Sequence, residues 1–366
     1  MAKNTRSIDR VCKMKGQRLL AFFLLLAGAS TAIAHEFSVN MDHRSSSGLA
    51  YKEHWLDKGL NPDAKTVAAS LNASAGAVAE VGGLELEVAA KYKGYYVGSE
   101  NVLYLAALAE TSNKFAIPHN GIYSLNGRLQ MLQSRQVTLS KTLQFGDNLK
   151  LHLKPHVFSI EDYQSAKARG TLAVDGQNAN VQGTLNRVGT RRFGFLVNEK
   201  EDQGWGWGLD VAGTYTQGPW RIDFSANNLL SQLRFSSVHY SNRLYNVNAV
   251  NGEIEIKRHN SFSMTGEYGH QKSNERLPVQ TQIALSNSNW NQWQAGLYSV
   301  SDRVTPWLAY QYSHGPWYAR ATTMQFQNLS LDLSWLSANG SGIGVGVTFA
   351  GNGKPRLGQL MAKVVW

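Results

Sequence analysis

The chain has 366 residues, a formal net charge of +10 and a composition that is 43% hydrophobic and only 17% charged. Six Lys or Arg and one Asp fall within residues 1–34, so the rest of the chain carries a charge nearer +5. This excess is small, and no nucleic-acid partner is expected. Beyond residue 34 no run of 18 apolar residues occurs, which excludes a membrane protein built from spanning helices.

Residues 1–34 have the features of a signal peptide. The eleven-residue apolar run Leu19–Ala29 follows a basic stretch and precedes the small-residue sequence Ala32-Ile33-Ala34. The run is shorter than the roughly 20 residues of a spanning helix, and an A-x-A sequence is typical of a cleavage site. We therefore expect a mature chain that begins at His35, with a retained N-terminal anchor as the alternative. The basic stretch comprises Arg10, Lys13, Lys15 and Arg18.

The single cysteine, Cys12, lies upstream of the apolar run and would be removed with the signal peptide. A mature chain without a thiol has no disulfide, no cysteine nucleophile and no thiolate metal site. This composition suits a protein that crosses the oxidising periplasm.

Apolar and polar residues alternate densely from residue 205 onward. Residues 205–216, 220–227, 329–335 and 343–349 each carry apolar side chains at every second position. A period of two indicates a strand with one face in an apolar medium, and about ten residues suffice for a tilted strand to cross a bilayer. The sequence predicts an all-β fold, a closed antiparallel transmembrane β-barrel of about 14 strands (roughly 12–18) over residues 81–366.

The last residues of the chain repeat this pattern. Trp366, Val364, Ala362 and Leu360 alternate with more polar residues up to the carboxylate. A terminal strand that ends on an aromatic residue resembles the last strand of bacterial outer-membrane barrels, in which these positions act as an assembly signal. The resemblance implies the barrel assembly machinery as a partner.

The predicted connections fall into a short and a long class. The sequences 217–219, 314–316 and 338–340 are tight turns rich in Gly, Pro and Asn, whereas 165–203, 231–250 and 271–276 are expected to be long outer loops. Aromatic residues flank two of the tight turns, which predicts an interface girdle on the periplasmic side. The girdle candidates are Tyr215, Trp220, Tyr312 and Trp317.

Residues 35–80 do not alternate. The Ala-rich stretch Ala64–Val81 favours a short helix, so residues 35–80 are predicted to form a luminal plug or a periplasmic extension.

Charged and polar residues on the opposite face of the predicted strands would line the lumen, since lipid would penalise them there. Cross-lumen ion pairs that brace the barrel and a wet pore are both compatible with this pattern. The lumen-facing candidates are Lys150, His152, Lys154, Asp210, Arg221, Asp223, Arg320 and Asp332.

No constellation indicates a catalytic, metal or cofactor site. His152 and His156 share a strand face but lie about 13 Å apart at the strand rise, too far for one metal ion. The sequence Gly204-Trp-Gly-Trp-Gly208 has no helix after it, as a phosphate-binding loop would require, and its glycines are interpreted as small luminal residues. We predict that the protein is not an enzyme.

The order VTLSKTLQFGDNLKLHLKPHVFSIEDYQ, GWGWGLDVAGTYTQGPWRIDFSANNLL and RLPVQTQIALS, followed by hairpins, is similar to FadL-type channels and to TraF-like barrels. The resemblance covers roughly residues 70–366. The Asn-Pro-Ala turn of such families has no proline here: Asn72-Ala73-Ser74-Ala75 stands in its place, and Asn61-Pro62-Asp63-Ala64 lies too early.

The resemblance implies a bacterial outer-membrane protein in contact with outer-membrane lipid and lipopolysaccharide. A passive channel for small hydrophobic or amphipathic compounds is the first expectation. A structural or secretion- or conjugation-associated barrel without transport activity is the alternative. The sequence gives neither the substrate nor the oligomeric state.

Overall fold

The computed structural model describes residues 36–45, 60–81, 83–111, 114–116, 120–176, 178–190, 204–249, 253–255, 262–290, 292–324, 328–349 and 355–365. The predicted signal peptide and Trp366 lie outside these described residues.

Among the described residues, fourteen strands form a closed ring in which every neighbouring pair is antiparallel. The ring closes because β1 pairs with β2 on one edge and with the C-terminal strand β19 on the other. The predicted fold class and strand number are confirmed. In ring order the strands are β1 (Glu36–Ser45), β2 (Thr66–Val81), β3 (Leu84–Ser99), β6 (Gly127–Phe145), β7 (Leu149–Asp175), β9 (Gly204–Gln217), β10 (Trp220–Ala249), β13 (Gln280–Asn287), β14 (Trp293–Val300), β15 (Arg303–His314), β16 (Trp317–Met324), β17 (Asn328–Leu336), β18 (Gly342–Phe349) and β19 (Pro355–Val365).

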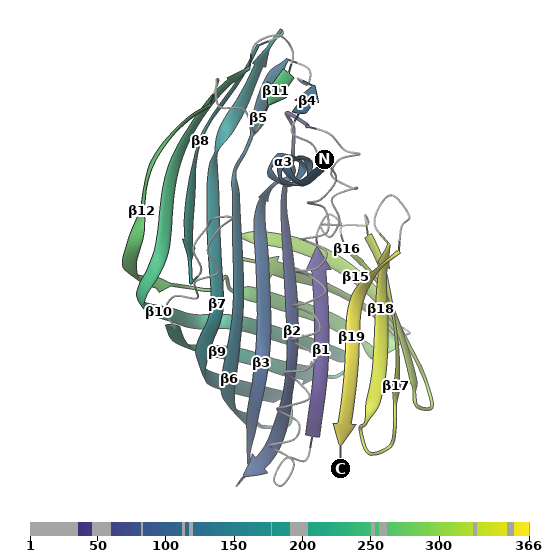
Figure 1. Cartoon of the computed structure of the whole chain (residues 1–366). Coiled ribbons are helices and arrows are strands. Elements are labelled where there is room, and N and C mark those ends of the chain that lie inside the picture. Colours follow the sequence, from purple (N-terminus) through teal and green to yellow (C-terminus); the bar gives the residue numbers. More distant parts are fainter. Residues whose placement is uncertain are drawn as a thin grey trace.

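One side of the barrel rises far above the other (Figure 1). β7 and β10 are 27 and 30 residues long, and both pair with β9 below and with β8 (Asn178–Gly189) above. β12 (Phe262–Glu275) and β5 (Gly121–Ser124) pair with the upper parts of β10 and β7. β8 therefore continues the line of β9, and β12 that of β13.

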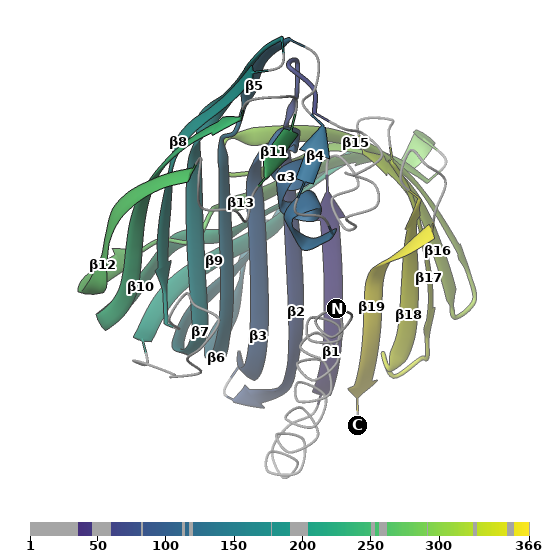
Figure 2. The same cartoon turned by 45° about the horizontal axis from the view of Figure 1, so that its top comes forward.

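Little helix is present among the described residues. Helix α3 (Glu100–Thr111) lies at the upper rim beside the two-stranded pair β4 (Lys114–Ala116) and β11 (Glu253–Glu255), as Figure 2 shows, and η2 (Ser288–Trp290) is a single turn between β13 and β14. Val102 and Leu105 of α3 pack against a small core that contains Tyr123 and Leu172.

The two faces of the wall differ as the alternation predicts. On β17, Leu331 and Leu333 are 45% and 48% exposed on the outer face, whereas Asp332 between them points inward, opposite Arg320 in the register of β16. An apolar outer face and a polar inner face are typical of a transmembrane barrel, in which lipid contacts one side of each strand.

The prediction for residues 35–80 is wrong where the structure describes them. β1 and β2 occupy 36–45 and 66–81, and both are part of the wall. The Ala-rich stretch is a strand because the ladders of β1 and β3 flank it on both sides, and this pairing overrides the helix preference of Ala. Its small side chains also permit a close approach: Cα atoms of β2 and β14 come within 8 Å of each other.

The predicted long loops are largely strand. β7 and β8 fill 165–175 and 178–189, β10 continues through 231–249, and β12 extends to Glu275. These stretches were interpreted as loop because polar residues dominate them and their apolar residues, such as Leu172 and Val174, are too few to show a regular alternation. The tight turns are as predicted: Gly218, Gly315 and Gly340 have positive φ between paired strands, the conformation for which glycine is best suited.

Candidate functional site

Aromatic residues on the outer surface form a belt at the lower edge of the wall, and a pair of exposed Trp residues lies higher on β9. Trp220, Tyr312 and Trp317 are exposed beside the lower turns, and Tyr215 donates its hydroxyl to Gln217 there. The structure adds Trp293 to this lower belt. Such belts mark the levels of the lipid headgroups.

An exposed aromatic pair on β9 was not predicted from sequence. Trp205 and Trp207 are exposed on β9, and the Arg234 guanidinium lies 5.1 Å from the centre of the Trp205 ring. Trp207 donates to Gln232, which also accepts from Arg234. These residues begin a strand at the edge of the irregular region, so the alternation alone did not predict their contacts with β10.

The lower lumen contains all the lumen-facing candidates. Arg221 and Asp223 lie opposite the outward Trp220 and Ile222, and Asp223 accepts from Thr214 at 2.6 Å and from Arg221 at 2.9 Å. His152 bonds to Thr142 at 2.8 Å. Lys150, His152 and Lys154 share a face of β7 with buried His156, and Lys154 opposes Asp210 in the register with β9. Arg320, opposite Asp332, lies 5.2 Å from the ring centre of Trp307.

Above this polar region an apolar cluster, here called the waist, fills the lumen. It draws side chains from strands on opposite sides of the ring, and Tyr163 stacks on Phe235 with ring centres 5.1 Å apart. Its members are Ala68, Tyr95, Leu132, Phe158, Ile160, Tyr163, Leu233, Phe235, Val238, Leu277, Ala284, Tyr298, Val300, Trp307 and Ala309.

The side chain of Asn228 connects strands of the waist across the lumen through hydrogen bonds. It is 1% exposed, sits at a bulge of β10 with φ of 55°, and its side-chain amide donates to the Tyr95 hydroxyl at 2.9 Å and to the Pro278 carbonyl at 3.0 Å. Its side-chain oxygen accepts from Lys93 at 2.8 Å, and its backbone N–H donates to Asp210 at 2.6 Å. One side chain thus links β3, β10 and the segment before β13.

Further hydrogen bonds connect β2, β13 and β14 on the opposite side of the waist. Ser70 of β2 and Tyr298 of β14 bond through their hydroxyls at 2.7 Å, and Gln280 donates to the same Tyr298 oxygen at 3.2 Å. Arg44 of β1 also reaches across to Gln282, and its guanidinium lies 5.2 Å from the Tyr298 ring centre.

The glycines of 204–208 are inner-face residues packed against the waist, as interpreted from sequence. A Cβ atom at Gly206 would overlap the Phe158 ring, and one at Gly208 would overlap the His156 ring. The glycines therefore make room for large side chains on the neighbouring strand.

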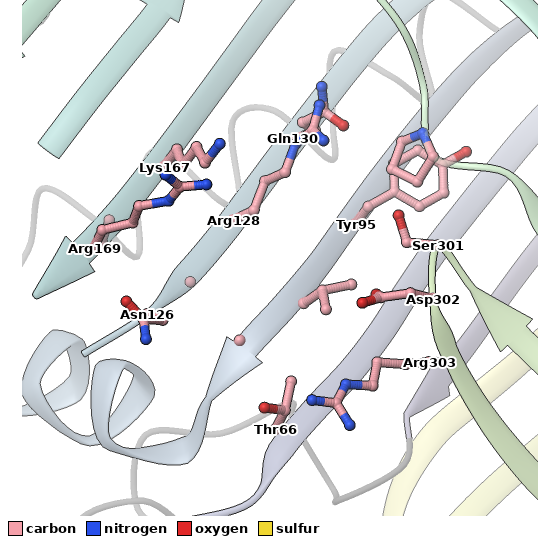
Figure 3. Close-up of a pocket in the computed structure, with 15 residues that line it drawn as sticks. Thr66, Tyr95, Asn126, Arg128, Gln130, Lys167, Arg169, Ser301, Asp302 and Arg303 are labelled. Atoms are coloured by element: carbon pink, nitrogen blue, oxygen red, sulfur yellow. The ribbon is translucent and has the colours of Figure 1, made fainter. Parts of the chain in front are cut away.

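A cavity of about 700 Å³, here called the mouth cavity, opens above the waist. Its walls come from β2, β3, β6 and β7 on one side and from the β14–β15 turn on the other (Figure 3). Tyr95, Gln130 and Pro278 belong to its lining, and Tyr95 is also a waist residue. The cavity thus adjoins the apolar cluster. The lining includes Thr66, Asn126, Arg128, Lys167, Arg169, Ser301, Asp302 and Arg303.

Sequence reasoning missed the mouth cavity. Its charged residues stand in stretches assigned to an outer loop or left unassigned, and only the register between β6 and β7 aligns Arg128 with Lys167. The sequence does indicate the bulge of β10, because the alternation of 220–227 stops at Asn227-Asn228, where the bulge lies.

Within the described ranges, no three His, Cys, Asp or Glu side chains come together as a metal site would require. Over the same residues, no helix has the length and apolarity needed to span a bilayer.

Several solved structures match along nearly the whole chain. The Ralstonia pickettii toluene transporter TbuX aligns over 91% of this chain and 87% of its own, with 11% identity and a TM-score of 0.42. The P. putida toluene transporter TodX aligns over 92% of this chain and 89% of its own, with 10% identity and a TM-score of 0.40. The CymD monoaromatic hydrocarbon channel aligns over 90% of this chain and 87% of its own, with 13% identity and a TM-score of 0.39.

No protein-family model and no curated protein matches the chain. At these identities and TM-scores the likeness to solved structures concerns the fold alone. The closed ring of 14 strands is shown by the strand pairing of the described residues alone. The TraF-like resemblance stays a prediction.

Proposed function

We propose that the protein is a passive outer-membrane channel for small hydrophobic or amphipathic compounds. The observation that carries the proposal is the apolar waist, a cluster of buried apolar side chains between a polar lower lumen and a charged mouth. An aqueous pore is lined by polar side chains along its length, and this lumen is not.

The waist favours apolar solutes for a physical reason. Burying apolar surface is favourable by about 25 cal/mol per Å², whereas a small ion would have to lose its hydration among Phe, Leu and Val side chains. A compound held in the mouth cavity contacts Tyr95 and Pro278 first, and both border the waist.

A structural barrel without transport activity is the second candidate. The observation that favours it is the set of cross-lumen bonds centred on Asn228 and Tyr298, which brace the wall and close the passage in this conformation. Both candidates require an outer-membrane location, which fractionation and heat-modifiable gel migration would test.

Uptake of 1-N-phenylnaphthylamine by cells with an intact lipopolysaccharide layer separates the two candidates. The probe fluoresces after entering an apolar environment, and the layer slows its entry. A channel should increase the initial rate in cells that produce the protein, with little ion conductance in planar bilayers. An unchanged rate at a verified amount of folded barrel would contradict the channel.

A further inference from the structure

The mouth cavity carries charge that a neutral hydrocarbon does not require. Figure 3 shows Arg128, Lys167 and Arg169 on one wall, facing the turn that carries Asp302 and Arg303. Four cations thus stand against one carboxylate. Among the residues that the structure describes, none of the four cations forms an ion pair. A concave wall with charge of one sign raises the local concentration of the opposite ion, so the cavity suits an anion.

Gln130 adds a second recognition element. Its side chain is 1% exposed, and its amide N–H groups donate to the Tyr163 hydroxyl at 3.0 Å and to the Arg276 carbonyl at 3.2 Å. The Arg276 carbonyl can only accept, which fixes the orientation of the amide. The remaining side-chain oxygen is buried and has no hydrogen-bond partner, although Gln130 lines the cavity.

A buried acceptor without a donor is unfavourable. A ligand O–H or N–H group that reaches this oxygen, after the side chains that cover it shift, would remove this cost. A compound with a carboxylate alone would not, because it offers no donor at that point.

The rest of the lining is apolar and partly aromatic. Tyr95, Val97 and Pro278 face the same space, and the cavity of about 700 Å³ lies within the usual range for sites of small organic molecules. A flat ring would contact the Tyr95 ring and leave its acidic substituent among the cations.

We propose that the mouth cavity is a binding site for aromatic acids that also carry a hydroxyl group. This inference rests on the proposed channel function and specifies its substrate class. The carboxylate lies toward Arg128, Lys167 and Arg169, the ring lies against Tyr95, and the hydroxyl donates to the Gln130 oxygen.

A lipid phosphate is a less suitable occupant because these cations are on the inner face. Arg128 shares that face with Gln130, two residues along β6, whereas the exposed Trp205 and the Arg234 beside it are on the outer face.

Isothermal titration of the detergent-solubilised full barrel tests the site with 4-hydroxybenzoate, benzoate and phenol. The expected order of affinity is 4-hydroxybenzoate first, with benzoate and phenol each weaker by about tenfold, the effect of one hydrogen bond or charge contact. Raising the salt concentration to about 0.5 M should weaken the two acids but not phenol.

Three variants assign the contacts. Arg169→Gln should weaken both acids by several-fold and leave phenol unchanged. Gln130→Met, which conserves volume, should abolish the advantage of 4-hydroxybenzoate over benzoate, and its retained benzoate binding shows that the variant is folded. Lys150→Gln, an exposed cation of the lower lumen, is the matched control and should change none of the three.

Equal affinity for the three compounds, or equal effects of Arg169→Gln and Lys150→Gln, would overturn the inference. If cells still take up the neutral probe under that outcome, the channel proposal stands while its substrate class fails. If the acids bind as expected but no probe enters, the channel proposal fails and the inferred site stands as a binding site only.

Discussion

Replacing Asn228 by Ala would remove three hydrogen bonds at the centre of the lumen. The Tyr95 hydroxyl, the Pro278 carbonyl and the Lys93 ammonium would each lose a bonding partner. Leaving a buried polar group unsatisfied costs about 1–3 kcal/mol. Ala at φ of 55° adds about 1 kcal/mol, because Asn adopts this conformation more readily. Since the three groups share one cluster and their effects are not additive, we expect a total loss of about 3–6 kcal/mol.

Urea unfolding of the refolded barrel in lipid vesicles, followed by Trp fluorescence, measures this loss. Asn227→Ala, an exposed neighbour, is the matched control and should change the free energy of unfolding by less than about 0.5 kcal/mol. Asn228→Gly loses the same hydrogen bonds but fits the backbone, so it should be about 1 kcal/mol less damaging than Ala. The reasoning fails if Asn228→Ala is within about 1 kcal/mol of the wild type.

Three further changes test the wall. Leu331→Arg puts a cation against lipid and should lower the free energy of unfolding by about 2–4 kcal/mol. Ser330→Arg, on the inner face, should lower it much less. Equal losses of the two variants in urea titrations would contradict the assigned faces. Gly206→Leu should overlap the Phe158 ring and destabilise the barrel by about 1–3 kcal/mol, seen as a lower temperature of heat-modifiable migration; an unchanged temperature would contradict it. Deletion of Trp366 should reduce the amount that reaches the outer membrane, whereas Trp366→Phe should be nearly silent; immunoblots showing no loss on deletion would refute the assembly role.

The alternating strands could be predicted from sequence because lipid imposes a simple rule. On β17 and β18 every outward position must be apolar, and Leu331, Leu333 and Val345 follow this rule. The strand number followed from counting such segments. Side chains on the inner face obey no comparable rule, so their partners could not be predicted.

The N-terminal strands were missed because their alternation has little hydrophobic contrast in β2 and is short in β1. In β1, Phe37, Val39 and Met41 are apolar at every second position, and in β2 every second residue is a small or branched apolar one. Because most of these β2 residues are Ala, the stretch was interpreted as helix, and Ala68 and Ser70 are small where β2 approaches β14. The upper extension was missed because its apolar residues, among them Leu172 and Val174, pack in the small core beside α3 and are too few to show a regular alternation.

The candidate site depends on contacts between distant parts of the sequence. Gln130 and Arg276 are 146 residues apart, and Asn228 and Tyr95 are 133 apart. No local pattern specifies such pairs; the ring closure and the bulge at Asn228 bring them together. The unsatisfied oxygen of Gln130 likewise has no signature in the sequence.

The central claim is that solutes cross the barrel through its waist, and filling the waist tests this most directly. Ala68 is a buried waist residue on β2, and Ala362 is an exposed residue on the outer face of β19. The measurement is the initial rate of 1-N-phenylnaphthylamine uptake by cells that hold equal amounts of heat-modifiable Ala68→Phe, Ala362→Phe or wild-type barrel. We predict that Ala68→Phe reduces the protein-dependent rate by several-fold while Ala362→Phe leaves it unchanged. Equal rates for all three proteins would contradict passage through the waist.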